Sequence, residues 1–300
     1  MFLIDEDSIY GIADHGLPFS SGVVTRLSHS QQFVDADAQV TGLLFTTLTM
    51  YIRPVHAEHD LPTLRTFIRQ NPLGILTTAV DSPSHHFLQS SHIPWLLDIA
   101  DNTSETELGT LRGHIARANP QAKAIIHDLT QGSSAATAPT LQKDILIIFN
   151  GPAQHYVTPK FYTETKPSTG KVVPTWDYAA VEVYGRATIY FDTKDPATDA
   201  FLSSQVAGLS QFAETSIMKY SRPWSVTDSP ENYVGLLKKA IIGIEIEITE
   251  MNGRWKMSQE LSEGDRAGVI AGFEALGAPV AKEIAETVKQ RAELAQQKKA

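Results

Sequence analysis

Hydrophobic and polar residues recur with changing periods along this chain, and the periods predict its elements. Residues 59–69 place Leu61, Leu64, Phe67 and Ile68 on one helical face, and Pro72 ends the pattern. Residues 241–250 instead alternate Ile with Gly, Glu and Thr, which is typical of a strand with one buried face. The chain therefore mixes helices with half-buried strands.

The same periods, read together with turn formers, predict the remaining elements. We expect strands at 73–80, 92–98, 109–115, 144–149 and 179–191, and helices at 120–128, 197–214, 230–240, 263–276 and 279–297. Asn252-Gly253 is a strong hairpin signal, so residues 254–259 should return antiparallel. Antiparallel strands with attached helices predict an α+β fold, a barrel decorated by helices.

Two segments do not fit this alternation. Residues 1–49 show no sustained period, so we expect a poorly ordered N-terminal extension before a main domain at 50–276 and a C-terminal helix and tail at 277–300. Residues 151–177 form a long irregular stretch rich in aromatic side chains. Long structureless stretches inside compact domains are usually functional or disordered, and the aromatic residues favour function.

Composition narrows the class of protein. The chain has 300 residues, 42% of them hydrophobic, a net charge of −9 and no cysteine, which excludes disulfides, thiolate nucleophiles and Cys-type metal sites. The acidic N-terminus does not resemble a signal peptide, and no apolar run is long enough to span a membrane, so we expect a cytoplasmic protein without a membrane partner. The negative charge makes a nucleic-acid partner unfavourable, although a local basic surface on a dimer could still bind DNA.

Polar residues and turn formers crowd the stretch 111–121. Arg117 and Asn119 precede the predicted helix start at Pro120, where free backbone N–H groups and the helix dipole favour a phosphate or another anion. Alternatively, Asn119 simply caps a helix whose first residue is Pro120. Spacing alone does not separate these two explanations.

Other candidate side chains are individually ambiguous. Arg254 and Lys256 share a strand face, where they could clamp an anion or form the wet face of an edge strand. Trp176 and Tyr178 also share a face, and could stack on a planar ring or fill a barrel end. The ten histidines all lie within the first 155 residues but form no His-Glu-x-x-His pattern, so we predict no metal site.

Taken together, these stretches resemble the PaiB-like family of FMN-binding split-barrel proteins, whose bacterial members are known as negative transcriptional regulators. The resemblance covers roughly residues 50–275. The stretches that carry it are Met50–Pro54, Ser91–Pro94, Gly113–Pro120, Phe149–Pro152, Val173–Tyr178, Ile242–Ile246 and Trp255–Gln259.

The resemblance implies an antiparallel split β-barrel, similar to pyridoxamine-phosphate oxidases, that binds FMN at the interface of a homodimer. It implies that the phosphate is held by His114, Arg117 and Asn119, and that His92 and Pro94 border the flavin ring. Trp176, Tyr178, Lys256 and Gln259 would close the pocket, from the same or the other subunit. If the chain is a flavin-binding redox protein, His155 and Tyr156 in the irregular stretch are the best candidates for substrate contact. This chain has Asp177 where the family more often has Asn, which would put a negative charge near the site.

The resulting functional prediction is a flavin-dependent redox protein, which could be an FMN-dependent oxidoreductase, with no catalytic base identified. One alternative is a transcriptional repressor of the PaiB type. Others are a haem-binding barrel and a barrel that has lost its cofactor. We find no basic recognition helix, which ranks the repressor below the flavoprotein.

Overall fold

The computed structural model of the 300-residue chain describes residues 52–131 and 139–297. The prediction of a poorly ordered segment at 1–49 lies outside the described residues. The described residues form a compact unit built on one antiparallel sheet.

Nine strands make up the sheet. They are β1 (Ala57–Glu58), β2 (Leu73–Ala79), β3 (Leu88–Pro94), β4 (Leu96–Asp98), β5 (Thr110–Ala116), β6 (Ile145–Asn150), β7 (His155–Val157), β8 (Thr175–Tyr190) and β9 (Ile241–Lys256). The main path runs β3-β2-β6-β8-β9-β5-β4, while β1 pairs with β9 and β7 pairs with β8. Every one of these pairings is antiparallel.

The two edge strands of the path, β3 and β4, are one continuous stretch of chain. Only Trp95 separates β3, which pairs with β2, from β4, which pairs with β5. The stretch 88–98 therefore passes from one edge of the sheet to the other and curls it into a split barrel. The predicted α+β fold, an antiparallel barrel with flanking helices, is confirmed.

Trp95 fills the interior at the point of closure. Its side chain is buried, and a Cβ atom added at Gly74 or Gly113 would overlap the indole. These two glycines, on β2 and β5, are thus needed because the large ring approaches both strands closely.

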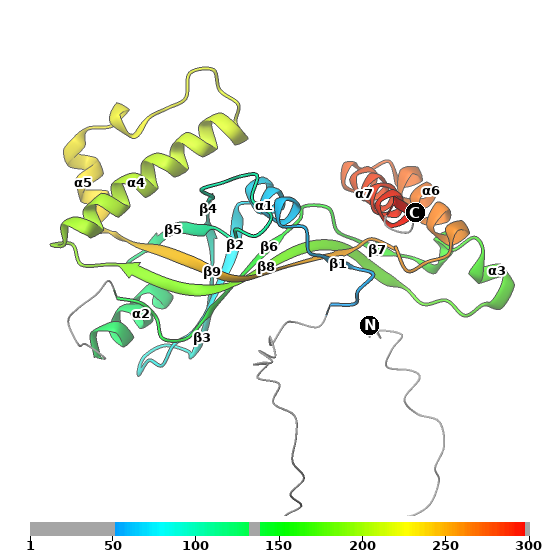
Figure 1. Ribbon diagram of the computed structural model, residues 1–300, viewed down its shortest axis with the longest axis horizontal. Helices are drawn as coiled ribbons and strands as arrows, with labels where there is room; N and C mark the ends of the chain where they lie inside the picture. Colours follow the sequence, from blue (N-terminus) through cyan, green and yellow to red (C-terminus); the bar gives the residue numbers. More distant parts are fainter. Residues whose placement is uncertain (1–51, 132–138, 298–300) are drawn as a thin grey trace, which may run out of the picture. The chain divides into compact units, whose positions relative to one another are not determined.

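Seven α-helices accompany the barrel in the described residues. Their bounds are α1 (Leu61–Gln70), α2 (Pro120–Gln131), α3 (Thr165–Thr169), α4 (Pro196–Phe212), α5 (Glu231–Lys239), α6 (Glu263–Leu276) and α7 (Pro279–Gln297). Helices α4 and α5 stand at one end of the long β8–β9 ribbon, and α6 and α7 stand at the other (Figure 1). No helix in the described part of the chain is long and apolar enough to cross a membrane.

The predicted hairpin at Asn252-Gly253 is wrong. Strand β9 runs unbroken through both residues, which pair with Glu182 and Val181 of β8. Gly253 is needed for space, because a Cβ there would overlap Leu64 of α1. Here tertiary packing overrides the local turn preference.

The interpretation of 151–177 as irregular also needs correction. The segment contains β7, a short 3-10 turn at Pro159–Phe161 and α3, and β8 begins at Thr175. Strand β7 pairs with the first three residues of β8, so a two-stranded segment extends that end of β8. Trp176 and Tyr178 consequently lie on a strand.

Candidate functional site

One face of the sheet points away from the barrel interior and carries several of the predicted residues. A row of directly paired residues crosses five strands on this outer face: His92, Ile75, Ile148, Glu182 and Asn252. Leu73 and Leu88 on the same side of β2 and β3 are 57% and 64% exposed. His92 is exposed and Pro94 half-buried, so β3 presents both to this face, as the site prediction requires.

Farther along the ribbon, the outer face carries aromatic rings and cations together. Tyr178 pairs with Lys256, and its hydroxyl accepts a 2.8 Å hydrogen bond from Nη1 of Arg254. Trp176 pairs with Tyr156, whose ring meets it edge to face at 6.4 Å. The structure therefore brings Trp176, Tyr178, Lys256 and Tyr156 into one group.

The ammonium of Lys256 is held in place by its own neighbours. Its Nζ donates to Thr175 Oγ1 and, at 3.3 Å, to the Trp176 carbonyl oxygen. The carboxylate of Glu260 lies 3.9 Å away and partly balances the charge. These contacts fix a cation beside two aromatic rings.

Two of the predicted site residues, Gln259 and His155, contact neighbouring parts of the fold and not the group around Tyr178 and Lys256. The Gln259 side chain accepts from Met257 N and donates to the Trp255 carbonyl oxygen, both at 2.6 Å, so it closes the turn after β9. The ring of His155 packs against Phe273 of α6, with its Nδ1 2.8 Å from the Tyr156 carbonyl oxygen. In the described residues, neither side chain forms a hydrogen bond with the Trp176, Tyr178, Lys256 or Tyr156 side chains.

Asp177 points to the opposite face from Trp176 and Tyr178. It is fully buried, and its Oδ2 accepts a 2.9 Å hydrogen bond from Ser258 Oγ, while Oδ1 has no partner among the described residues. Burial raises the pKa of Asp177 to about 7, against the opposing effects of Ser258 and Lys256. The expectation that Asp177 places a charge in the site is therefore wrong, because strand alternation turns it inward.

The predicted phosphate ligands lie at the end of β5. Arg117 donates from Nε to the Lys239 carbonyl oxygen (3.2 Å) and from Nη2 to those of Phe191 (2.6 Å) and Ile241 (3.4 Å). These bonds tie together the ends of β8, α5 and β9, and none of them uses Nη1. Arg117 thus has a structural role, and its Nη1 takes no part in these three hydrogen bonds.

Asn119 caps α2, as the simpler explanation of its position predicted. Its Oδ1 accepts from Gln121 N at 2.8 Å, and its Nδ2 donates to Ser91 Oγ at 3.1 Å. The second bond places the helix start beside β3, next to His92. His114 lies farther along β5, where burial lowers its pKa and leaves Nδ1 without a partner in the described chain.

The two halves of the predicted site are far apart within one chain. Tyr178 lies four residues before Glu182 on β8, or about 13 Å along the strand. The paired row then separates Glu182 from His92 by three strand spacings, about 14 Å. The two steps combine to roughly 20 Å along the sheet. One planar ring system is too short to contact both His92 and Tyr178 of the same chain.

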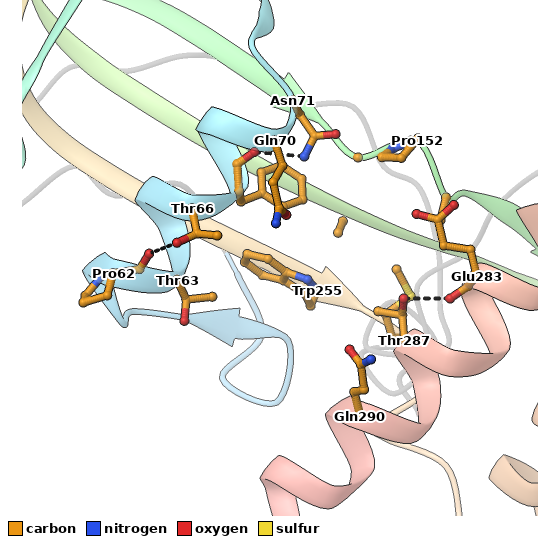
Figure 2. Close-up of a pocket in the computed structure, with 15 residues that line it drawn as sticks. Pro62, Thr63, Thr66, Gln70, Asn71, Pro152, Trp255, Glu283, Thr287 and Gln290 are labelled. Atoms are coloured by element: carbon orange, nitrogen blue, oxygen red, sulfur yellow. Dashed lines mark hydrogen bonds between the residues drawn. The ribbon is translucent and has the colours of Figure 1, made fainter. Parts of the chain in front are cut away.

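A groove of about 530 Å³ lies elsewhere, between α1 and α7 (Figure 2). Trp255 lies at its base, with threonine and glutamine side chains of both helices along the walls. It contains none of the predicted residues, and the described residues that line it include no Lys, Arg or His. The groove therefore does not suit a phosphate group.

FMN combines a phosphate with a flat ring that has one hydrogen-bonding edge, and the outer face offers groups for both. The Arg117 guanidinium, whose Nη1 is outside the three carbonyl bonds and which lies two residues before the Asn119 cap of α2, suits the phosphate. Trp176 and Tyr178 suit the ring, and Lys256 and Arg254 suit its acceptor atoms. Glu182 offers an Oε2 without a partner in the described chain, although burial raises its pKa and the atom is covered by protein. The residues present fit the group.

Comparison with known proteins gives a consistent result. A family model described as "Putative FMN-binding domain" matches residues 50–250. An uncharacterized protein of Aspergillus fumigatus is 55% identical over 261 residues, covering 83% of this chain and 100% of that protein. Protease synthase and sporulation protein PAI 2 of Bacillus subtilis is 24% identical, covering 81% and 98%.

Among solved structures, the flavocytochrome Anf3 of Azotobacter vinelandii aligns with a TM-score of 0.37 and 12% identity, covering 69% of this chain and 72% of that one. The family model spans well over half of the chain, which confirms both the predicted family and FMN as its cofactor. This chain belongs to the FMN-binding family that the model describes.

Proposed function

We propose that this protein is a flavin-dependent redox protein that holds FMN on the outer face of its sheet, between two copies of the chain. The observation that carries the proposal is the outer face itself. It combines His92 and Pro94 with the group of Trp176, Tyr178 and Lys256, and its strands β2 and β6 pack mainly against other strands in the described structure.

FMN supplies the electron-transfer chemistry, and the chain binds and orients it. Lys256 and Arg254 provide N–H donors and positive charge toward acceptor atoms of the ring, while Trp176 provides a flat apolar surface. Tyr156, directly beside Trp176, is in place to contact a second substrate. His155, turned toward Phe273, supports that strand from behind.

The separation of the two residue groups supports a site shared by two copies. Because His92 and Tyr178 of one chain are roughly 20 Å apart along the sheet, a single ring would take one group from each copy. The predicted homodimer is thus part of the proposal. The repressor and haem-binding alternatives remain predictions from the resemblance.

The Arg117→Ala variant tests the phosphate site, with riboflavin as the matched ligand that lacks the phosphate. Losing one charged hydrogen bond of about 1.5–3 kcal/mol should raise the dissociation constant for FMN about 10- to 100-fold. Riboflavin affinity should stay unchanged, because its ring contacts are the same. Arg186→Ala, at an exposed position on β8, is the control.

Flavin fluorescence quenching measures both affinities. Equal weakening of FMN and riboflavin would mean that Arg117 acts only through its bonds to backbone carbonyls. Unchanged FMN affinity would remove Arg117 from the site.

A further inference from the structure

The groove between α1 and α7 is of ligand size and shares no residue with the proposed flavin site. Its volume of about 530 Å³ lies within the roughly 300–1,000 Å³ range of small-molecule sites. Its floor consists of buried apolar side chains: Phe67, Trp255 and Met257. The floor therefore offers an apolar body of a ligand a surface to lie on.

The walls on either side of this floor are polar. Figure 2 shows Trp255 between the side chains of the two helices. The labelled polar side chains of the walls are Thr63, Thr66 and Gln70 of α1, Asn71 directly after it, and Glu283, Thr287 and Gln290 of α7.

Two wall hydroxyls can only accept a hydrogen bond from a ligand, because each already donates its one proton. Thr66 Oγ1 donates to the Pro62 carbonyl oxygen, and Thr287 Oγ1 donates to the Glu283 carbonyl oxygen, both at 2.8 Å. What remains on both hydroxyls is acceptor capacity.

Two wall amides turn their nitrogen toward their own helix. Asn71 Nδ2 donates to the Phe67 carbonyl oxygen at 2.9 Å, and Gln290 Nε2 donates to a Glu286 carboxylate oxygen at 3.2 Å. Oδ1 of Asn71 and Oε1 of Gln290 accept no hydrogen bond within the described residues. Both oxygens are available to a ligand that carries N–H donors.

Glu283 decides which charge the groove accepts. It is the one ionisable side chain among the described lining residues, and its carboxylate has no hydrogen-bond or ion-pair partner in the described part of the chain. An anionic ligand would meet this carboxylate with no lining cation to offset it. A cation with N–H donors would satisfy the carboxylate and the neighbouring acceptors together.

The arginines of the two helices have partners outside the groove. Arg65 and Arg69 of α1 donate to the loop at 102–107, and Arg291 of α7 is paired with Glu58. The Arg291 guanidinium also lies 4.1 Å from the centroid of the indole in the groove floor. The lysines within α7 are exposed and are not among the lining residues. These cations therefore leave the Glu283 carboxylate unpaired.

We propose that this groove binds a small organic cation, an alkylguanidinium or alkylammonium. Its apolar chain lies against Phe67 and Trp255, and its N–H groups donate to Glu283 and to the amide oxygens of Asn71 and Gln290. The proposal goes beyond FMN binding and does not depend on it, because none of the residues assigned to the flavin lines the groove.

The first test follows Trp255 by fluorine NMR on protein saturated with FMN. The chain contains four tryptophans, so fluorotryptophan-labelled protein should give four resonances, and Trp255→Phe identifies one of them. n-Butylguanidinium should shift this resonance with a dissociation constant of about 1 mM, as expected for a ligand of its size. Its neutral analogue N-butylurea and the anion pentanoate should bind at least about 10-fold more weakly.

Two variants locate the binding in the groove. Glu283→Gln removes the charge but keeps the shape, and should weaken butylguanidinium about 5-fold while leaving butylurea unchanged. Glu293→Gln, the same substitution at an exposed position of α7 outside the groove, should have little effect. Thr66→Lys places a competing ammonium on the opposite wall and should weaken butylguanidinium at least about 10-fold, with circular dichroism verifying the fold.

An unshifted Trp255 resonance, equal binding of butylguanidinium and butylurea, or equal effects of Glu283→Gln and Glu293→Gln would overturn the proposal. A capped Gly-Arg-Gly peptide distinguishes the sources of the cation. Tighter binding than butylguanidinium would identify an arginine side chain of a peptide, and weaker binding would identify a free small molecule. Flavin absorbance, recorded on the same samples, reports the flavin site separately, so the two proposals can fail independently.

Discussion

Replacing the buried Asp177 by Asn should make the protein less sensitive to alkaline pH. The carboxyl group is fully buried, its Oδ2 accepts a hydrogen bond from Ser258 Oγ, and its Oδ1 has no partner within the described structure. Burial raises its pKa from 3.8 to about 7. The folded protein therefore prefers the neutral carboxyl, whereas the unfolded chain ionises it freely.

The sign and size follow from linkage between protonation and folding. Because the folded pKa is higher than the unfolded one, Asp177 costs no stability below pH 3.8 and progressively more as the pH rises toward 7. A difference of about 3 pKa units corresponds to about 4 kcal/mol once the group is ionised in both states. Between pH 5 and pH 8 its contribution should fall by about 2–3 kcal/mol.

Urea unfolding of wild type and Asp177→Asn, followed by tryptophan fluorescence at both pH values, measures this difference. The asparagine still accepts from Ser258, and any cost of its unpaired amide is the same at both pH values. The stability of the variant relative to wild type should rise by about 2–3 kcal/mol from pH 5 to pH 8. His114, whose pKa is lowered by burial, titrates in both proteins and cancels in the comparison.

Asp144→Asn, the same substitution at an exposed position, is the control and should show no such change. If wild type and Asp177→Asn lose or gain stability in parallel between the two pH values, Asp177 is not the buried, neutral acid that its surroundings indicate.

Two further substitutions test the packing around β9. Gly253→Ala should destabilise by about 1–3 kcal/mol, because the added methyl overlaps Leu64. Gly235→Ala in α5 meets open space and should stabilise by up to about 1 kcal/mol; equal effects in thermal unfolding would refute the argument. Arg291→Ala breaks the 2.5 Å ion pair with the buried Glu58 and should lower the free energy of unfolding by about 2–4 kcal/mol. The loss is limited because Glu58 still accepts hydrogen bonds from two backbone N–H groups. Exposed Lys289→Ala on the same helix should cost almost nothing, and a similar loss in both variants would contradict the ion-pair explanation.

Periodicity in the sequence predicted most helices and strands because their buried faces recur at regular spacing. Helix α2 begins at Pro120, where the capping residue Asn119 indicated, and α1 begins at Leu61, within the stretch 59–69 that the apolar spacing predicted. The hairpin was mispredicted because Asn252-Gly253 has the local chemistry of a turn. The need for a small residue against Leu64 comes from a contact distant in sequence, which no local pattern contains.

The site was predictable in part for the same reason. Strand alternation correctly put Trp176 with Tyr178 and Arg254 with Lys256 on shared faces. The three carbonyl partners of Arg117 come from other elements, so its structural role could not be seen in its own segment. The sequence predicted a helix at 230–240, but its spacing did not show that the helix, α5, has no buried residue.

The most direct test of FMN binding is the visible absorbance spectrum of purified protein after incubation with FMN and gel filtration. We expect flavin bands that elute with the protein at close to one FMN per chain, and that are reduced in Arg117→Ala. A protein that elutes without flavin, while circular dichroism shows it folded, would contradict the assignment of a flavin site to the outer face.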